Sequence, residues 1–440
     1  MVATGRFAGI FRATMHSFGY QNGSLHCEAT DLQALASEHG TPLFVYSKKT
    51  ILDNYQRLAS AMSELDCQIC FATKANSNIA VLNQLAKAGA GFDVVSSGEI
   101  FRVEKAGGDP GKCTFAGVAK TRAEIEHGLK AGIYSFNAES EAELVLIDKV
   151  AGEMGVKAPV ALRLNPNVDA KTHAKITTGK SGNKFGIDFD FIRDAYARAS
   201  KLPNLNIRGL QMHIGSQLTT AAPFIEAVEK VVPLVEELKA AYGIEFFSIG
   251  GGIGIVYEDS LASGDPAWWE TSDALTPEEY AAKLVPSLKP LALKIILEPG
   301  RYMVGNAGVL LTEVIYEKQG TTKLFKIVDA GMNDLIRPTL YEGHHDIVPL
   351  QESDGETEVV DVVGPVCESG DYFATNRELA KVEEGDVIAV LSAGAYGFVM
   401  ASNYNSRPYP AEILVDGETA HVIRQRQSMD DLIAGETIVE

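Results

Sequence analysis

The sequence predicts an α/β protein made of a (β/α)8 barrel with a second, mostly antiparallel β domain. Between about residues 44 and 300, short β-rich runs alternate with amphipathic helical patterns, which is typical of a parallel sheet. This stretch contains eight strand-like runs, the number that closes such a barrel. After Gly300 the helical patterns give way to β-rich runs separated by turns, which indicates an antiparallel sheet.

The barrel elements are predicted from alternating β-branched or aromatic runs and from helical spacing of apolar residues. The eight predicted strands are 67–71, 91–95, 113–116, 133–136, 160–164, 209–213, 246–249 and 295–297. The predicted helices between them are 79–88, 122–131, 141–151, 191–201, 221–241 and 277–285. In such a barrel the carboxyl ends of all strands meet at one rim, where active sites are built.

Three segments follow from this pattern: residues 1–43, a barrel over 44–300, and a β domain over 301–440. The predicted strands of the β domain are 309–316, 324–328, 358–363, 387–391 and 411–415. The first segment contains a possible strand over 23–27 and a short helix over 30–39, and we expect it to belong to the β domain. The pattern assigns no role to residues 1–15 or to the loop 260–276.

Composition narrows the class of protein. With 440 residues and 46% apolar side chains, the chain can bury a large core without metal or disulfides. It has no apolar run of about 20 residues and no signal-peptide core near its start, so we expect a cytoplasmic protein. The formal charge of −19 argues against nucleic acid or an anionic membrane as a partner.

The five cysteines suit a reducing compartment, since they form no regular framework. Cys67 and Cys70 make a C-x-x-C, but within a strand this spacing places them on opposite faces. Buried thiols are therefore favoured over a redox or zinc site. The adjacent His344 and His345 lack the spaced ligands of a metal site, and no metal is expected.

Residues that are typical of catalytic and ligand-binding sites follow four of the predicted barrel strands. The first strand leads into Lys74, the sixth ends in His213 and continues to Ser216, the seventh opens into glycines 250–252, and the eighth leads into residues 298–301. Taken alone, each of these segments has an ordinary explanation. In the same order, they could be a solvated lysine, a hydrogen-bonded core histidine, a tight turn and a turn that closes the barrel. Together they gather an amine, a flat ring, a backbone amide cradle and a carboxylate with an arginine at one rim.

Pyridoxal phosphate requires this combination. A lysine forms a Schiff base with its aldehyde, and glycines let backbone N–H groups approach phosphate oxygens without Cβ clashes. A carboxylate beside the pyridine nitrogen keeps that nitrogen protonated, so that the ring accepts the electron pair left by departing CO2. The rim therefore predicts a pyridoxal-phosphate enzyme whose reaction passes through a carbanion-like intermediate.

The motifs also resemble a known family. Segments 71–76 (FATKAN), 213–217 (HIGSQ), 250–252 (GGG) and 298–301 (EPGR) are similar to those of the barrel-type pyridoxal-phosphate-dependent decarboxylases, which share their architecture with alanine racemase. Within that family the likeness is greatest to the diaminopimelate decarboxylases of lysine biosynthesis, over about residues 40–435. The resemblance implies decarboxylation of meso-2,6-diaminopimelate to L-lysine and CO2.

The resemblance also implies roles for single residues. Lys74 would bind the cofactor aldehyde, His213 would stack on the ring, and Glu298 would face the pyridine nitrogen. The other cofactor-binding residues implied are Ser216, Gly252, Pro299, Gly300, Arg301 and Tyr396.

For the substrate, segment 364–368 (GPVCE) resembles one that a partner subunit inserts into the site, which implies a homodimer. Cys367 would then protonate the carbon left by CO2, and Glu368 would bind the distal amine. Segment 336–341 (IRPTLY) resembles one that grips the far carboxylate, where an arginine offers a planar fork. The substrate-binding residues implied are Arg301, Arg337, Tyr341, Glu368 and Tyr396.

Other functions remain open on the same architecture. A related decarboxylase could act on ornithine, arginine or a carboxylated polyamine, and CO2 release across these substrates would separate them. A racemase is disfavoured because racemases of this fold place an arginine where Glu298 lies. A non-catalytic cofactor-binding protein is disfavoured because the carriers lack the β domain and the inactive relatives lack Lys74 or Cys367.

Overall fold

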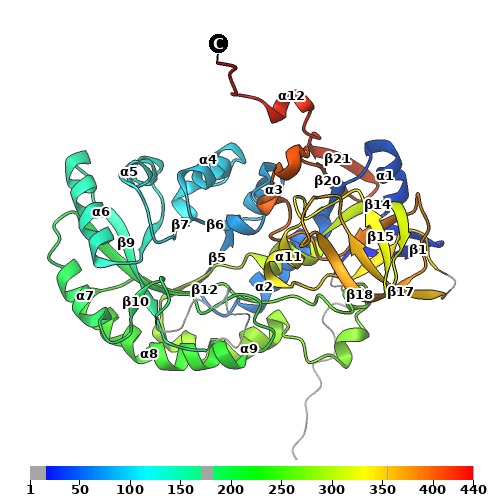
Figure 1. Cartoon of the computed structure of the whole chain (residues 1–440). Coiled ribbons are helices and arrows are strands. Elements are labelled where there is room, and N and C mark those ends of the chain that lie inside the picture. Colours follow the sequence, from blue (N-terminus) through cyan, green and yellow to red (C-terminus); the bar gives the residue numbers. More distant parts are fainter. Residues whose placement is uncertain (1–15, 170–181, 354, 440) are drawn as a thin grey trace, which may run out of the picture.

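The computed structural model describes residues 16–169, 182–353 and 355–439. Its first domain is a closed barrel of eight parallel strands ringed by helices (Figure 1). The strands, in barrel order, are β5 (Cys67–Ala72), β6 (Gly91–Val94), β7 (Cys113–Phe115), β8 (Ser135–Ala138), β9 (Ala158–Asn165), β11 (Leu205–Met212), β12 (Phe246–Gly250) and β13 (Lys294–Leu297). Pairing of β13 with β5 closes the barrel, and the short β10 (Ile187–Asp188) pairs in parallel with the end of β9. The predicted barrel is thereby confirmed.

Helices cover the outside of the barrel. They are α2 (Lys48–Ala61), α3 (Ile79–Lys87), α4 (Ser97–Lys105), α5 (Arg122–Ala131), α6 (Glu141–Met154), α7 (Ile192–Ala199), α8 (Ala222–Tyr242) and α9 (Pro277–Leu288). Capping residues in the local sequence determine where these helices begin and end. At α5, Thr121 and Glu124 form a capping box, and Gly132 ends the helix in the left-handed conformation. Within the described residues, no helix combines the length and apolar character needed to cross a bilayer.

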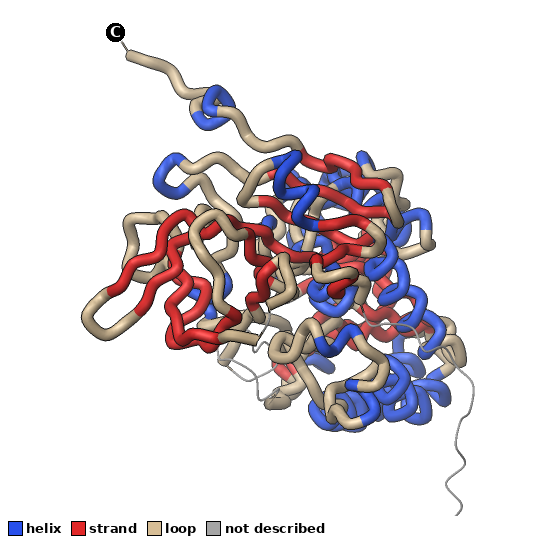
Figure 2. Tube along the Cα trace, turned by 90° about the vertical axis from the view of Figure 1, so that its right-hand side faces the viewer, coloured by secondary structure: helices blue, strands red, loops and turns tan. Residues whose placement is uncertain are grey.

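The second domain is the mostly antiparallel sheet expected after residue 300, seen on the right of Figure 1 and facing the viewer in Figure 2. Its strands are β14 (Gly308–Gln319), β15 (Leu324–Val328), β16 (Ile347–Pro349), β17 (Thr357–Val363), β18 (Tyr372–Ala380), β19 (Val387–Val390), β20 (Ala411–Asp416) and β21 (Thr419–Arg424). Three short helices accompany them: α10 (Arg301–Val304), α11 (Arg337–Tyr341) and α12 (Met429–Leu432). Two pairings are parallel, β15 with β17 and β20 with β4.

The N-terminal segment packs on this second domain. It contains β1 (Phe18–Gln21), β2 (Ser24–Cys27), β3 (Thr30–Asp31), α1 (Leu32–His39) and β4 (Leu43–Ser47). Apolar side chains from β1, β2 and α1 share one buried cluster with β4, β14, β19 and β20. The expected boundary at residue 44 falls inside β4, which pairs with β14 and β20, and the first barrel helix follows directly.

Both domains meet at the carboxyl ends of the barrel strands. The turn after β13 continues through α10 into β14, which carries the chain from the barrel into the second sheet. The backbone N–H of Tyr396, in the β domain, donates to the carbonyl of Ala75, next to the end of β5. This contact fixes the β domain over the barrel mouth.

Candidate active site

A cavity of about 350 Å³ lies at the barrel mouth, beneath the β domain. It is lined by ten of the predicted site residues: Lys74, His213, Ser216, Gly252, Glu298, Gly300, Arg301, Arg337, Tyr341 and Tyr396. The predicted cofactor-binding residue Pro299 is not part of this lining; its carbonyl accepts the N–H of Ala72 at 3.0 Å. Lys74 and Tyr396, which are 322 positions apart in the sequence, thus line the same cavity.

Lys74 lies in a single 3₁₀ turn (Thr73–Ala75) at the end of β5. Its side chain is 41% exposed, since it opens into the cavity, and its Nζ donates to Asp93 Oδ2 at 2.8 Å. Burial opposes the charged amine, but the carboxylate of Asp93 prevails and raises the pKa of Lys74. Asp93 is 1% exposed on β6, so the lysine has a buried counter-ion.

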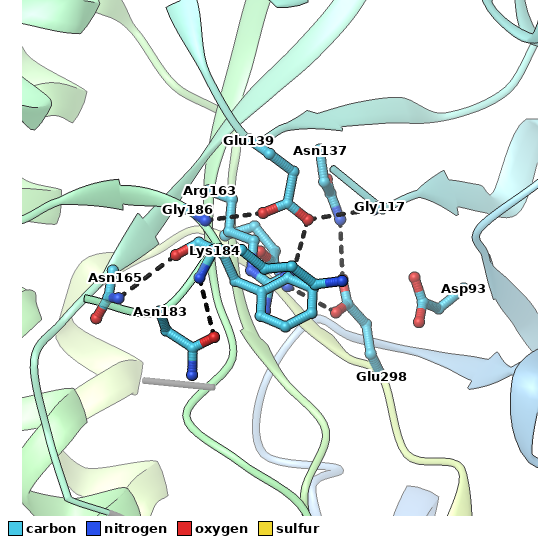
Figure 3. Close-up of polar contacts among 12 residues, drawn as sticks. Asp93, Gly117, Asn137, Glu139, Arg163, Asn165, Asn183, Lys184, Gly186 and Glu298 are labelled. Atoms are coloured by element: carbon cyan, nitrogen blue, oxygen red, sulfur yellow. Dashed lines mark hydrogen bonds and ion pairs between the residues drawn. The ribbon is translucent and has the colours of Figure 1, made fainter. Parts of the chain in front are cut away.

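Glu298 follows β13 and is held by three donors. Its Oε1 accepts from Asn137 Nδ2 at 3.2 Å and from Ser248 Oγ at 2.9 Å, and its Oε2 accepts from Gln211 Nε2 at 2.9 Å. Burial and the nearby carboxylate of Asp93 raise the pKa of Glu298. Figure 3 shows Asn137 reaching Glu298 from above, with Asp93 beside them. The carboxyl group has one fixed orientation at the floor of the cavity.

His213 follows β11 and remains a neutral imidazole. The N–H of Gly251 donates to its Nδ1 at 3.2 Å, so Nδ1 carries no proton. Burial, together with the charges of Arg163 and Lys74, lowers the pKa of His213 well below its usual value. An uncharged flat ring therefore faces the cavity.

The glycine turn after β12 can contain only glycine. A Cβ on Gly250 would lie 2.4 Å from the carbonyl oxygen of Met212, and one on Gly251 would lie 2.1 Å from that of Glu298. Gly252 has φ +115°, and its Cβ would lie 2.6 Å from the carbonyl oxygen of Gly215. The three loops that follow β11, β12 and β13 approach one another closely here, and Gly252 of this turn lines the cavity.

Arg301 completes this wall. Its guanidinium donates to the hydroxyl of Tyr257 at 2.5 Å and to Ser216 Oγ at 3.2 Å. Its Nε is buried without a hydrogen-bond partner among the described residues. A buried cation with an unsatisfied donor at the cavity wall fits an anionic group such as phosphate.

Arg337 lies at the start of α11 and is 7% exposed. Its guanidinium carbon lies 4.5 Å from the ring centre of Tyr257, and its Nη1 lies 2.6 Å from Nε2 of His345. Tyr341, at the other end of α11, lines the same cavity. Arg337 is therefore one of three buried arginines that line the cavity, with Arg163 and Arg301.

The structure does not bring Cys367 and Glu368 into this cavity. Cys367 is exposed, and its N–H donates to Asn405 Oδ1 at 2.9 Å. Glu368 accepts from the hydroxyl of Tyr404 at 3.1 Å. Asp371 holds their loop, since its Oδ2 accepts the N–H of Val366 at 2.6 Å. The two residues lie on the surface of the β domain, outside the cavity lining of their own chain.

Sequence reasoning missed several polar residues of the site. Asp93 and Arg163 lie inside predicted barrel strands and both line the cavity. Arg163 is held by Glu139, whose Oε1 accepts from Nη1 at 2.6 Å and whose Oε2 accepts the N–H of Gly186 at 2.9 Å, as Figure 3 shows. A charged residue is costly to bury without a partner. The presence of Asp93 and Arg163 inside otherwise apolar predicted strands was therefore the signal that could have identified them as site residues.

A second hollow, of about 500 Å³, lies at the opposite end of the barrel. Its cations are already paired: Arg208 with Glu245 at 2.7 Å and Lys294 with Asp66 at 2.6 Å. It therefore offers no unpaired cation, and the chemistry lies at the other mouth. Within the described residues no group of histidine, cysteine, aspartate or glutamate is arranged to hold a metal ion.

Comparison with known proteins agrees with this site. A family model described as "Pyridoxal-dependent decarboxylase, pyridoxal binding domain" matches residues 48–305. The diaminopimelate decarboxylase of Vibrio cholerae is 48% identical over 97% of this chain and all of its own length, and that of Pseudomonas aeruginosa is 46% identical over the same shares. The chain belongs to the diaminopimelate decarboxylase family.

Solved structures of this family have the same fold. Diaminopimelate decarboxylase from Helicobacter pylori complexed with L-lysine is 40% identical, with a TM-score of 0.86 over 92% of this chain and 98% of that one. The enzyme from M. jannaschii in complex with L-lysine is 38% identical, with a TM-score of 0.89 over 96% and 98%. The predicted family, fold, carboxy-lyase class and pyridoxal phosphate cofactor are confirmed.

The residues present fit pyridoxal phosphate. Lys74 offers an amine within the cavity, the turn 250–252 with Arg301 offers donors for phosphate, and Glu298 offers a fixed carboxylate. These groups lie on different walls of one cavity, which suits a ring that needs a covalent tether, an anion cradle and a partner for its nitrogen.

Proposed function

We propose that this diaminopimelate decarboxylase converts meso-2,6-diaminopimelate to L-lysine and CO2 at the cavity of the barrel mouth. The observation that carries the proposal is the buried Arg337, which pairs with no carboxylate of the described residues and lies in the same cavity as Lys74 and Glu298. An amino acid with a second carboxylate at its far end would satisfy this arginine. The direct test is CO2 release from meso-2,6-diaminopimelate with and without added pyridoxal phosphate.

Each residue has a separate task in this proposal. Pyridoxal phosphate supplies the electron sink that stabilises the carbon left by CO2. Lys74 would hold the cofactor aldehyde through Nζ. His213 would offer its neutral ring to the cofactor ring, and Ser216, Gly252 and Arg301 would hold the phosphate. Glu298 holds a proton at the ring nitrogen.

Arg337 would bind the distal carboxylate, and Tyr341 and Tyr396 would line the passage to it. Ornithine, arginine and lysine end in a cation at this position and would be repelled. Arg337→Ala is expected to raise the KM for diaminopimelate by about 10- to 100-fold, since a charge-assisted hydrogen bond contributes about 1.5–3 kcal/mol. Steady-state CO2 release measures this effect.

The matched control is Arg208→Ala, which removes an arginine at the opposite end of the barrel and should leave KM unchanged. Release of CO2 from ornithine or arginine as fast as from diaminopimelate would instead support the alternative decarboxylases.

The proposal includes a homodimer in which a partner subunit supplies Cys367 and Glu368. Cys367 would return a proton to the carbon that loses CO2, and Glu368 would bind the distal amine. Two features support this: both residues lie on the surface of the β domain, and a neighbouring carboxylate fixes their loop. We also propose a cytoplasmic location, where the exposed Cys367 stays reduced.

Mixed chains test the shared site. Lys74→Ala and Cys367→Ala proteins should each be inactive, but their mixture should regain about a quarter of the wild-type rate, because random exchange makes about half the dimers mixed with one intact site each. Differently tagged chains allow the mixed dimers to be purified and assayed. Purified mixed dimers without activity would contradict the shared site.

A further inference from the structure

Arg337 is held by an uncharged partner, His345. The Nε2 of His345 lies 2.6 Å from Arg337 Nη1, and its Nδ1 lies 2.7 Å from the carbonyl oxygen of Leu391. A carbonyl can only accept, so Nδ1 carries the proton and Nε2 is free to accept from the arginine. His345 is 0% exposed, and both of its ring nitrogens are used. Burial and the adjacent Arg337 lower its pKa well below the usual value, so the ring stays neutral.

The rest of the surroundings of Arg337 also lack negative charge. The groups that act on its pKa besides burial are Tyr257, Arg301, Tyr396 and Tyr341. Tyr257 packs between the two arginines, with its ring centre 4.5 Å from the guanidinium carbon of Arg337 and 5.8 Å from that of Arg301. Within the described part of the chain, neither arginine forms an ion pair with a carboxylate.

The backbone brings His345 back to Arg337 over one short reversal. Helix α11 ends at Tyr341, its C-cap residue Glu342 has φ +51°, and the N–H of Gly343 donates to the carbonyl of Arg337 at 3.2 Å. A Cβ on Gly343 would lie only 3.4 Å from Arg337 Nη2. The turn therefore closes tightly around the guanidinium.

We propose that His345 is a specificity-determining positioning residue, whose neutral imidazole fixes the guanidinium of Arg337 toward the cavity and leaves its full charge for a substrate carboxylate. A carboxylate in its place would hold the arginine equally well but would compete with the substrate. A water molecule in the place of His345 would hold the Arg337 guanidinium in a less fixed orientation. The inference deepens the proposed function and rests on it, because it requires Arg337 to bind the distal carboxylate.

Substitutions at His345 test this role. His345→Leu removes the acceptor and should raise the KM for diaminopimelate about tenfold, with kcat within about threefold of wild type, because binding is lost equally in the ground and transition states. His345→Gln keeps a neutral acceptor and donor and should restore a KM within about threefold of wild type. His345→Glu is isosteric with glutamine but charged, and should raise KM at least as much as leucine does.

The matched control is His344→Gln. His344 contacts Asp346 and Arg377 instead of Arg337, and its replacement should leave KM unchanged. Bound-cofactor absorbance and thermal melting identify variants that fold as wild type, and only these are compared.

Inhibition gives a second measurement that a merely structural role would not change. As the reaction product, L-lysine has its ε-amine at the carbon that lost CO2 and its α-carboxylate at the far end, whereas cadaverine has no carboxylate. His345→Leu should weaken inhibition by L-lysine about tenfold and leave inhibition by cadaverine unchanged. An equal loss for both inhibitors would overturn the proposal.

A double-mutant cycle locates the effect. In an Arg337→Ala background, His345→Leu should not raise KM further, because the guanidinium that it positions is gone. Additive losses, or a wild-type KM for a folded His345→Leu enzyme, would overturn the inference while the proposed function stands. A wild-type enzyme that releases no CO2 from diaminopimelate would instead overturn the proposed function itself.

Discussion

Lys74→Ala is expected to lower CO2 release from diaminopimelate by roughly 10⁴-fold or more, the range seen when a covalent catalytic residue is removed. The reason is that Nζ is the amine in the cavity that can tether the cofactor aldehyde, and no exchange with the substrate amine can follow without it. The substitution should also abolish the absorbance band of the lysine-bound cofactor. Fixed-time CO2 assays measure the loss of turnover, and absorbance spectra measure the loss of the cofactor band.

Two further variants separate the covalent role of Lys74 from its charge. Lys74→Arg keeps a cation that can pair with Asp93 but cannot form a Schiff base, so it should be as inactive as alanine. Lys289→Ala removes a lysine that is 59% exposed and paired with Glu64 at the far end of the barrel, and should behave as wild type. Turnover by a folded Lys74→Arg or Lys74→Ala enzyme would refute the assignment.

The barrel could be predicted because each strand and helix is encoded locally. Strand β5 is the predicted strand 67–71 with one residue added, and helix α5 matches the predicted helix 122–131 residue for residue. Helix α4 was missed because only Ile100 and Val103 of its nine residues are buried, which leaves little periodic signal. Its cap, Ser96 accepting from the N–H of Glu99, was the remaining indication.

The second domain was harder to predict in detail. Strand β4 pairs with β14 and β20, each more than 200 residues away along the chain, and local patterns do not encode such pairing. Strand β18 was missed because its burial pattern is irregular, with Thr375 and Asn376 exposed and Asn376 at φ +48°. The register of this sheet depends on tertiary packing.

The residues of the candidate site likewise fall into those that the sequence could predict and those that it could not. Residues that follow strand ends, such as Lys74 and His213, were predicted because the fold fixes where those ends meet. His345 was noticed only as one of a histidine pair with weak evidence for metal. Its contact with Arg337 depends on the left-handed turn at Glu342, which nothing in the local sequence specifies.

Glu298→Gln is expected to lower kcat by roughly 100- to 1,000-fold, the cost of removing one oriented electrostatic group in an active site, with little change in KM. The amide keeps the shape of the carboxyl group but lacks the charge that holds a proton at the ring nitrogen. Steady-state rates and retained cofactor absorbance measure the loss of chemistry without loss of binding.

The surroundings of Glu298 can accept this amide, so the effect should report charge rather than misfolding. Asn137 Oδ1 and Gln211 Oε1 are both buried without a hydrogen-bond partner among the described residues. Either side chain can therefore turn its amide to present oxygen to the new NH2 group, and Ser248 Oγ can rotate. Glu298→Asp keeps the charge but withdraws it by one methylene, so its kcat should lie between those of glutamine and wild type. A glutamine variant with wild-type kcat would show that the ring nitrogen needs no carboxylate in this enzyme, and the assignment of Glu298 would be wrong.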